Sequence, residues 1–182
     1  MSGAGLIRRG VEALESLVTS GIPGVLGVIP TDPSTFNTAS ADARFVLGGT
    51  YWYGGNFYKY FQFKDAVTYV ATHSVEYASV GCTTVTNDRA GGSSLGRISA
   101  GKATRVHTTD FFGFSQVSGP VTLLTSGADD IAVGEGVFCH ATTDGTVDGT
   151  SASTFNTGLI GVATEADDNA ANTVAAILWL PK

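Results

Sequence analysis

The sequence predicts a mainly β fold: an antiparallel sandwich or barrel-like body with one short N-terminal amphipathic helix and an extended arm. Three observations carry this prediction. Apolar residues follow a helical period only near the N-terminus, β-branched and aromatic residues follow a period of two from Ala43 onward, and Gly, Asn and Asp clusters separate the short apolar runs. Strands at this spacing are typical of sandwiches and closed barrels. We therefore divide the chain into an arm, residues 1–40, and a β body, residues 41–182.

The length and composition allow a core that needs no disulfide framework. A globule of 182 residues buries roughly 70% of the surface that its unfolded chain exposes. Charged residues make up only 14% of the chain, against about 25% in average soluble domains, and a surface with so few charges favours contact with partners. The net charge of −6 and the scattered basic residues argue against nucleic acid as a partner.

The start of the chain does not have the pattern of a secretion signal. Glu12 and Glu15 interrupt the stretch in which a signal peptide needs continuous apolar residues. No apolar run approaches the roughly 20 residues that a membrane-spanning helix requires. We therefore expect synthesis in the cytoplasm, no membrane partner, and release only through lysis or assembly.

The first expected element is a short amphipathic helix over residues 6–18, which Gly21 and Pro23 end. A helix this short is not stable alone, so it must lie against another surface. Two placements stay open: packing on its own domain, or docking as an arm on a neighbouring subunit. The Pro- and Gly-rich connector of residues 21–40 favours the arm. The candidate contact residues of this arm are Leu6, Ile7, Arg8, Arg9, Val11, Leu14 and Val18.

The first expected strands form an aromatic hairpin. Residues 51–53 and 57–63 flank Gly54-Gly55-Asn56, whose glycines suit the positive φ of a tight turn. Aromatic side chains occupy both parities of the second run, so both faces of this sheet need cover. We expect one cover to come from a second chain, and a carbohydrate-stacking platform is the alternative. The candidate contact residues here are Tyr51, Trp52, Tyr53, Tyr58 and Tyr60.

The remaining strands alternate with turns toward the C-terminus. Residues 67–77 alternate apolar and polar side chains, which predicts one buried and one wet face. Residues 87–94 predict an exposed loop. Further strands are expected at 111–117, 121–124, 136–141, 159–163 and 173–180, with turns at Gly119-Pro120, 128–130, Asp144-Gly145 and 165–169.

No motif points to catalysis, a metal or a cofactor, and we expect none of the three. His73, His107 and His140 lie in no metal-binding spacing, and no GxSxG nucleophile turn occurs. His140 follows Cys139, but neighbouring strand residues point to opposite faces and cannot easily share a proton.

Turn chemistry is the preferred interpretation of the other polar clusters. The runs 144–149 and 165–169 hold carboxylates suited to calcium, but neither has the spacing of a calcium loop, so we interpret both as solvated turns. The run 91–96 resembles a phosphate-binding loop only loosely, because it lacks the Lys and the following helix. Cys82 and Cys139 are interpreted as two free thiols, with a single disulfide as the alternative.

The C-terminal half carries a series of short motifs. They are Phe112-Gly-Phe-Ser-Gln-Val-Ser-Gly-Pro, Ala132-Val-Gly-Glu-Gly-Val-Phe, Thr143-Asp-Gly-Thr-Val, Leu159-Ile-Gly-Val-Ala-Thr-Glu and the apolar run Val174 to Leu180. In this layout, over about 70 residues, the chain resembles the head decoration, or cement, proteins of tailed bacteriophages. The N-terminal helix and connector have no counterpart in the resemblance.

The resemblance implies a β-sandwich or barrel-like body, frequently trimeric, that binds the outer surface of the phage head where capsomers meet and strengthens the shell. The expected partners are then the major capsid protein and further copies of this chain, with a homotrimer favoured, on the capsid surface of the virion. No catalytic residues carry over, because the family has none. The alternative is a phage tail, fibre or receptor-binding domain that binds glycans. A hydrolase has no support beyond the frequency of β folds among glycan enzymes.

Overall fold

The described part of the chain is mainly β, which confirms the predicted fold class. The computed structural model describes residues 27–28, 32–36, 45–64, 68–89, 98–127, 130–140, 142–149, 158–167 and 172–180. The helix expected at residues 6–18 and most of the loop expected at 87–94 lie outside these ranges. A short 3-10 helix, η1 (Pro33–Thr35), is the helical element of the described residues.

Five strands close into a first ring, which we call barrel 1. They are β3 (Asn56–Phe63), β4 (Ser74–Tyr77), β5 (Thr84–Thr86), β6 (Ser99–Ala103) and β7 (Phe112–Gln116). The order around the ring is β3-β5-β4-β6-β7, and pairing of β3 with β7 closes it. The β3–β5 pair is parallel, and the other pairs of the ring are antiparallel.

Two further strands extend the sheet of barrel 1 beyond β3. The strand β2 (Thr50–Tyr53) forms the predicted hairpin with β3, and β1 (Gly27–Val28) runs parallel to β2. The turn of this hairpin has φ of 57° at Gly54 and 87° at Gly55. Positive φ at both central residues matches the right-handed twist of the strands, and glycine adopts it without steric cost. The aromatic hairpin is therefore confirmed.

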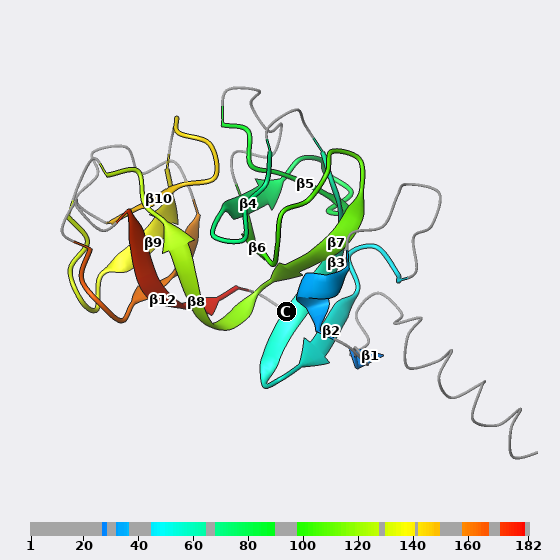
Figure 1. Cartoon of the computed structure of the whole chain (residues 1–182), viewed down its shortest axis with the longest axis horizontal. Helices are drawn as coiled ribbons and strands as arrows, with labels where there is room; N and C mark the ends of the chain where they lie inside the picture. Colours follow the sequence, from blue (N-terminus) through cyan, green and yellow to red (C-terminus); the bar gives the residue numbers. More distant parts are fainter. Residues whose placement is uncertain are drawn as a thin grey trace, which may run out of the picture.

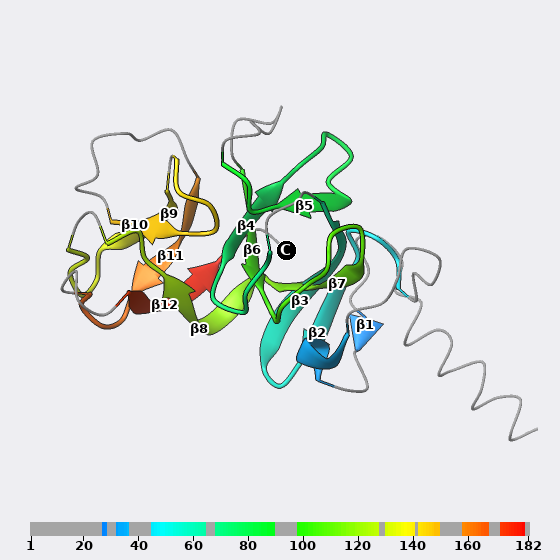
Figure 2. The ribbon, with the colours of Figure 1, turned by 45° about the horizontal axis from the view of Figure 1, so that its top comes forward.

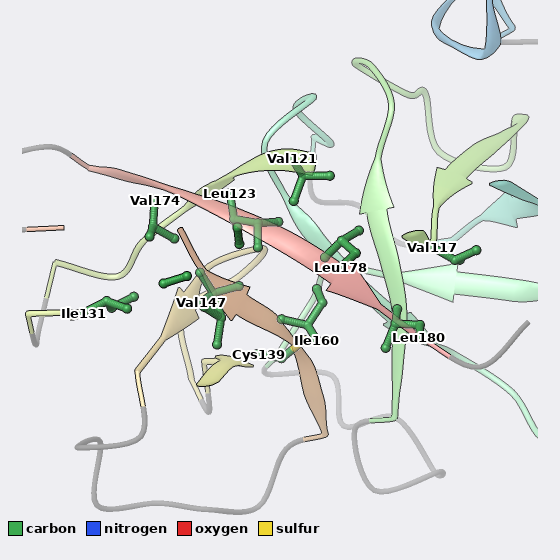
Figure 3. Close-up of a cluster of buried hydrophobic side chains, with 13 residues drawn as sticks. Val117, Val121, Leu123, Ile131, Cys139, Val147, Ile160, Val174, Leu178 and Leu180 are labelled. Carbon is green, nitrogen blue, oxygen red and sulfur yellow. The ribbon is translucent and has the colours of Figure 1, made fainter. Parts of the chain in front are cut away.

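The second half of the chain forms another ring, which we call barrel 2, beside the first (Figure 1). Its strands are β8 (Ser118–Leu124), β9 (Gly136–Cys139), β10 (Val147–Asp148), β11 (Leu159–Ala163) and β12 (Thr173–Trp179), in the order β10-β9-β11-β12-β8. A parallel bridge between Thr125 and Val147 joins the two ends of this sheet. Apolar side chains from all five strands fill its interior, among them Leu123, Val147 and Ile160 (Figure 3).

Two expectations for the strands were wrong. The strand expected at 67–77 is, over the described residues 68–77, confined to 74–77, because a turn occupies 71–72, and the face expected to be wet is buried at Ser74 and Glu76. Gly119-Pro120 is not a turn either, since both residues lie inside β8. The chain runs from β7 through the buried Val117 directly into β8, so one nearly continuous strand path serves both barrels.

Barrel 2 repeats barrel 1 strand for strand. In each ring the first strand pairs in parallel with the third and antiparallel with the fifth, and the second strand pairs with the third and fourth. The ladder registers agree residue by residue, so each residue of one barrel has a counterpart at the same ladder position of the other. Residues of β3, β4 and β5 have their counterparts 62 residues later: Phe63 pairs with Val85 as Thr125 pairs with Val147.

The fourth strands, β6 and β11, share an irregularity as well as a register. Each has a bulge opposite the second strand of its barrel, followed by a glycine, Gly101 or Gly161. A Cβ at either glycine would clash with a carbonyl oxygen of the neighbouring strand, that of Gln116 or Ile177. Gln116 and Ile177 are themselves counterparts, because they face Lys102 and Val162, the residues that follow the two glycines. The close approach of two backbones is therefore a repeated feature of the fold.

We predict that Gly161→Ala destabilises the protein although the new methyl group is small. The added Cβ meets backbone rather than a flexible side chain, and such overpacking costs about 1–3 kcal/mol. Gly81→Ala is the matched control, since its Cβ would find only ordinary contacts, the nearest at 3.6 Å from Thr83 Oγ1. Urea unfolding of both variants measures the difference. Equal stabilities would show that β11 and β12 can separate freely.

A buried histidine makes the stability of barrel 1 depend on pH. The ring of His107 stacks on Phe63 with centroids 3.8 Å apart, and its side chain is 2% exposed. Burial, helped by the charge of Arg105, lowers the pKa of His107 to about 3. The folded protein thus keeps this ring neutral at a pH at which the unfolded chain protonates it, below about 6.5.

We predict that His107→Phe, which keeps an aromatic ring on Phe63, flattens the acid side of the stability profile. Between pH 6.5 and about 3 the unfolded wild type binds one more proton at residue 107 than the folded protein does, so the stability from this site falls as the pH falls. The wild type should lose up to about 1.4 kcal/mol per pH unit more than the variant. Urea unfolding at pH 7, 6 and 5 tests this, and parallel profiles would contradict it.

Candidate functional surfaces

The aromatic residues of the predicted contact surface form a core on the outside of barrel 1. Tyr58 and Tyr60 of β3 point away from the barrel interior, as do Phe112 and Phe114 of β7. The aromatic cluster that covers this side consists of these four residues with Phe36, Phe45 and Tyr51. Rings meet edge to face, with centroids 5.1 Å apart between Phe45 and Tyr60 and 5.4 Å between Phe36 and Phe114. Such edge contacts add to the stabilisation that burial provides.

The second cover of the aromatic sheet comes from this chain and not from another one. Tyr51 and Tyr60 are fully buried and Tyr58 nearly so, while Tyr53 is partly buried and Trp52 is 42% exposed. The backbone N–H of Val46 donates to the Tyr51 hydroxyl at 2.9 Å, and burial raises the pKa of Tyr51. Aromatic side chains at both odd and even positions of residues 57–63 correctly predict a sheet that is covered on both faces. This pattern in the sequence does not show which chain provides the cover.

The seven candidate contact residues of the arm lie outside the described residues. Their role stays a prediction, and the aromatic hairpin contributes Trp52 as its exposed member.

A buried ion pair lies where the two barrels meet. The Arg89 guanidinium, Nη1, contacts the Glu76 carboxylate, Oε2, and both side chains are almost completely inaccessible to solvent. Arg89 Nη2 donates to the Ser74 hydroxyl at 2.8 Å, and that hydroxyl donates onward to the Thr146 carbonyl of barrel 2 at 3.0 Å. Desolvated charges are tolerated only when they are paired and hydrogen-bonded, as they are here.

A turn of barrel 2, residues 143–146, is docked into this junction by further polar contacts. The Asp144 carboxylate accepts from the backbone N–H of Arg89 at 2.7 Å, and Ser74 N–H donates to the Gly145 carbonyl at 2.7 Å. Asn87 Nδ2 and His73 Nδ1 lie 2.8 Å apart. Burial lowers the pKa of His73, and the nearby Asp144 carboxylate opposes this effect. We call this network of His73, Ser74, Glu76, Asn87, Arg89 and Asp144 the polar junction.

The sequence contained only part of the signal for the polar junction. The sequence predicts a wet face for Glu76 and gives no sign that His73 and Asp144 lie together. Arg89 follows a polar Asn-Asp pair in a stretch that predicts an exposed loop. A local pattern cannot reveal that a turn some 55 residues further along, at Asp144, lies on top of that loop.

The remaining candidates for chemistry are held in structural contacts. Cys139 points into the core of barrel 2, whereas His140 Nε2 lies 3.1 Å from Asp148 Oδ2 and His140 Nδ1 accepts from the backbone N–H of Thr143 at 2.8 Å. Cys82 and Cys139 are free thiols. Within the described ranges, no group of three or more His, Cys, Asp or Glu side chains is arranged to hold a metal ion.

A small polar pocket lies between η1 and barrel 1. It has a volume of about 190 Å³ and is lined by Asp32, Pro33, Ser34, Tyr58, Lys102, Thr104 and Gln116. Burial lowers the pKa of Lys102 and raises that of Tyr58. Pockets for small organic ligands are usually about 300–1,000 Å³ and mostly apolar, so this one is a seam between packed segments.

Four exposed apolar residues of barrel 2 lie on the outer side of its last two strands, β11 and β12. Leu159 is 51% exposed, Val162 40%, Ile177 50% and Trp179 87%. Val162 and Ile177 face each other across the β11–β12 ladder, and Ile177 also faces Pro120 of β8. We call Leu159, Val162, Ile177 and Trp179 the β11–β12 face. Exposed apolar residues that adjoin one another mark an interaction site, whereas scattered ones do not.

Membrane contact through a spanning helix finds no candidate in the described part of the chain, because no helix there has the length and apolar character to cross a bilayer.

Known proteins show little similarity to this chain. No protein-family model matches it, and no curated protein matches it either. Among solved structures, it is similar to the crystal structure of the N base of head fibre gp8.5 in bacteriophage phi29, at 14% sequence identity and a TM-score of 0.44. That match covers 67% of this chain and 92% of the other. A functional conclusion must therefore come from the residues of this chain.

We predict that breaking the buried ion pair from one side destabilises the protein strongly. Glu76→Gln leaves the Arg89 charge buried without its counter-charge, which costs about 3–5 kcal/mol. The double variant Glu76→Met with Arg89→Met removes both charges and should recover most of that loss. Urea unfolding measures all three chains.

The control is the exposed pair between Lys64 and Asp110, whose side chains are 41% and 56% accessible. Asp110→Asn should change stability by less than about 1 kcal/mol, because water screens this pair and Asn tolerates the positive φ of 65° at this position. A similarly small effect of Glu76→Gln would show that the polar junction does not hold the barrels together.

Proposed function

We propose that this protein is a structural component of a bacteriophage virion that binds the outer surface of the head and stabilises the shell. The observation that carries the proposal is a two-barrel body whose buried polar side chains serve its own fold, while apolar side chains are exposed together on one sheet face. The resemblance of the β7–β8, β9 and β11 motifs to head decoration proteins supports the same role. These motifs lie in β7 of barrel 1 and in the strands and turns of barrel 2.

The proposed mechanism is burial of surface on a lattice, without catalysis or a cofactor. Stable protein interfaces bury about 1,600 Å² in total, and many copies held side by side turn modest contacts into firm attachment. A body fixed by the polar junction loses little conformational entropy on binding, since its two barrels are already oriented. The proposed partners are the major capsid protein and further copies of this chain, with a trimer favoured. The place of action is the capsid surface, after synthesis in the host cytoplasm.

One observation favours a second candidate, a fibre or receptor-binding domain that recognises glycans. Trp179 is 87% exposed and Trp52 42%, and tryptophan rings are well suited to stack on sugars. The glycan alternative needs a concave site around such a ring. Neither tryptophan lines the polar pocket between η1 and barrel 1, so head binding is the preferred function.

We predict that the purified protein cosediments with expanded empty heads of its own phage, prepared without it, until a fixed number of sites is filled. Occupied heads should then resist heat better than bare heads, with disruption shifted upward by several degrees, because bound copies stabilise the assembled state. Sedimentation and light scattering during heating measure the two effects. An acidic β-protein of similar size serves as the control.

Failure to bind heads, combined with binding to host cells or to a glycan panel, would overturn the proposal and select the receptor-binding alternative. Binding to heads without any thermal protection would also contradict the stabilising role.

A further inference from the structure

The internal duplication allows the same surface to be compared in the two barrels. Lys102 and Gln116 face each other across β6 and β7, and their counterparts Val162 and Ile177 face each other across β11 and β12. The third member of each row, Tyr58 on β3 or Pro120 on β8, faces Gln116 or Ile177. Any difference in what covers these rows therefore reflects side-chain chemistry and not the fold.

In barrel 1 this row is covered by an earlier segment of the same chain. Residues 32–34 lie over Tyr58, Lys102 and Gln116, and Gln116 is only 7% exposed. Two contacts hold the segment in place. The Arg105 guanidinium donates to the Thr35 carbonyl at 3.2 Å, and the Phe36 ring packs on the ring of Phe114. The face of the first barrel is thus a binding surface for an extended arm.

In barrel 2 the corresponding row is more apolar and open. Val162 and Ile177 stand where Lys102 and Gln116 stand in barrel 1, and Leu159 and Trp179 extend the apolar surface toward the same end of the ladder. None of the described segments lies over this face, since its four residues are 40% to 87% exposed. Because a segment of the chain covers this row in barrel 1, and the same row in barrel 2 is apolar and exposed, the row in barrel 2 is suited to bind an apolar segment.

We propose that the β11–β12 face binds residues 6–18 of a second copy of this chain. That segment places Ile7, Val11, Leu14 and Val18 at helical spacing, and this apolar stripe matches an apolar sheet face. Its other side carries two arginines and two glutamates, Arg8, Arg9, Glu12 and Glu15, which remain in water. The inference deepens the proposed function, because arms exchanged between neighbours would tie the bound copies together.

The position of β1 favours a second copy over the chain's own barrel 2. The described part of the arm region starts with β1, at the end of the sheet beyond β2, while barrel 2 lies at the opposite side of barrel 1 (Figures 1 and 2). Only residues 19–26 separate the apolar stripe from β1, and eight extended residues span at most about 28 Å. β1 therefore lies across barrel 1 from the chain's own β11–β12 face, and this separation favours a face on a second copy.

Such a contact joins two different surfaces, an arm and a face, so it closes into a ring when the rotation allows. This geometry is compatible with the trimer that we propose. One arm and four exposed side chains bury less than a standard interface of about 1,600 Å², so each contact is weak and the closed ring strengthens it.

The test uses full-length chains in solution, without phage heads. Sedimentation velocity over a range of concentrations should show that the wild type self-associates. An arm variant, Leu14→Asp, and a face variant, Val162→Thr with Ile177→Thr, should each weaken association at least tenfold. Val80→Thr is the matched control, because Val80 is 79% exposed on barrel 1 and lies far from the face along the chain. Thermal unfolding of every variant checks that the β body stays folded.

Mixing the two variants gives the decisive result. The arm variant keeps an intact face and the face variant an intact arm, so an equimolar mixture should form a dimer and nothing larger, at a higher concentration than the wild type needs because its ring cannot close. A mixture that associates no better than either variant alone would overturn the inference. So would loss of association in the face variant alone, which indicates direct face-to-face pairing, or a wild type that is monomeric at every concentration, which indicates a different occupant. If the wild type also protects heads in that last case, the proposed function holds and only this inference fails.

Discussion

The buried ion pair between Arg89 and Glu76 is the interaction on which the arrangement of this molecule depends. Each barrel closes its own ladder, and the two are joined by the continuous β7–β8 path and by hydrogen bonds from Ser74 of β4 and from Arg89 to the turn that contains Asp144. A buried charge pair is a weak source of net stability but a demanding one in geometry, because any displacement leaves a charge unpaired in an apolar environment. The polar junction therefore gives the protein one shape to present to a partner.

Comparison of the two barrels distinguishes the features that both rings share from the surface side chains in which they differ. Both rings keep the parallel pairing of first and third strands, the bulge in the fourth strand, and the glycine that lets two backbones approach. Their outer faces differ instead. Barrel 1 has an aromatic exterior buried under residues 33–36 and 45–51, whereas barrel 2 exposes aliphatic residues and Trp179. Because the backbone is the same, this contrast lies in side chains that the ring does not require, and such side chains are free to serve recognition.

Local patterns located most of the β-strands. The runs at 57–63, 159–163 and 173–180 correspond closely to β3, β11 and β12, since alternation on a half-buried sheet is a property of neighbouring residues. The same rule failed at 67–77, where a turn and a covering loop from barrel 2 bury both parities of β4. It also mistook Gly119-Pro120 for a turn, although Gly119 has the φ of 91° that glycine permits while the strand continues.

The sequence by itself determined the fold class, the aromatic hairpin and the absence of a recognisable catalytic or metal-binding motif, because these follow from composition and short periods. The tertiary structure decided what lies far apart in the chain: the closure of two rings, the burial of Arg89, and the cover over Tyr51 and Tyr60. The repeat stayed hidden in the sequence because β-ladders constrain size and exposure more than identity. Few counterparts are the same residue, as Val85 and Val147 are, while Phe61 and Leu123 fill the same position with different side chains.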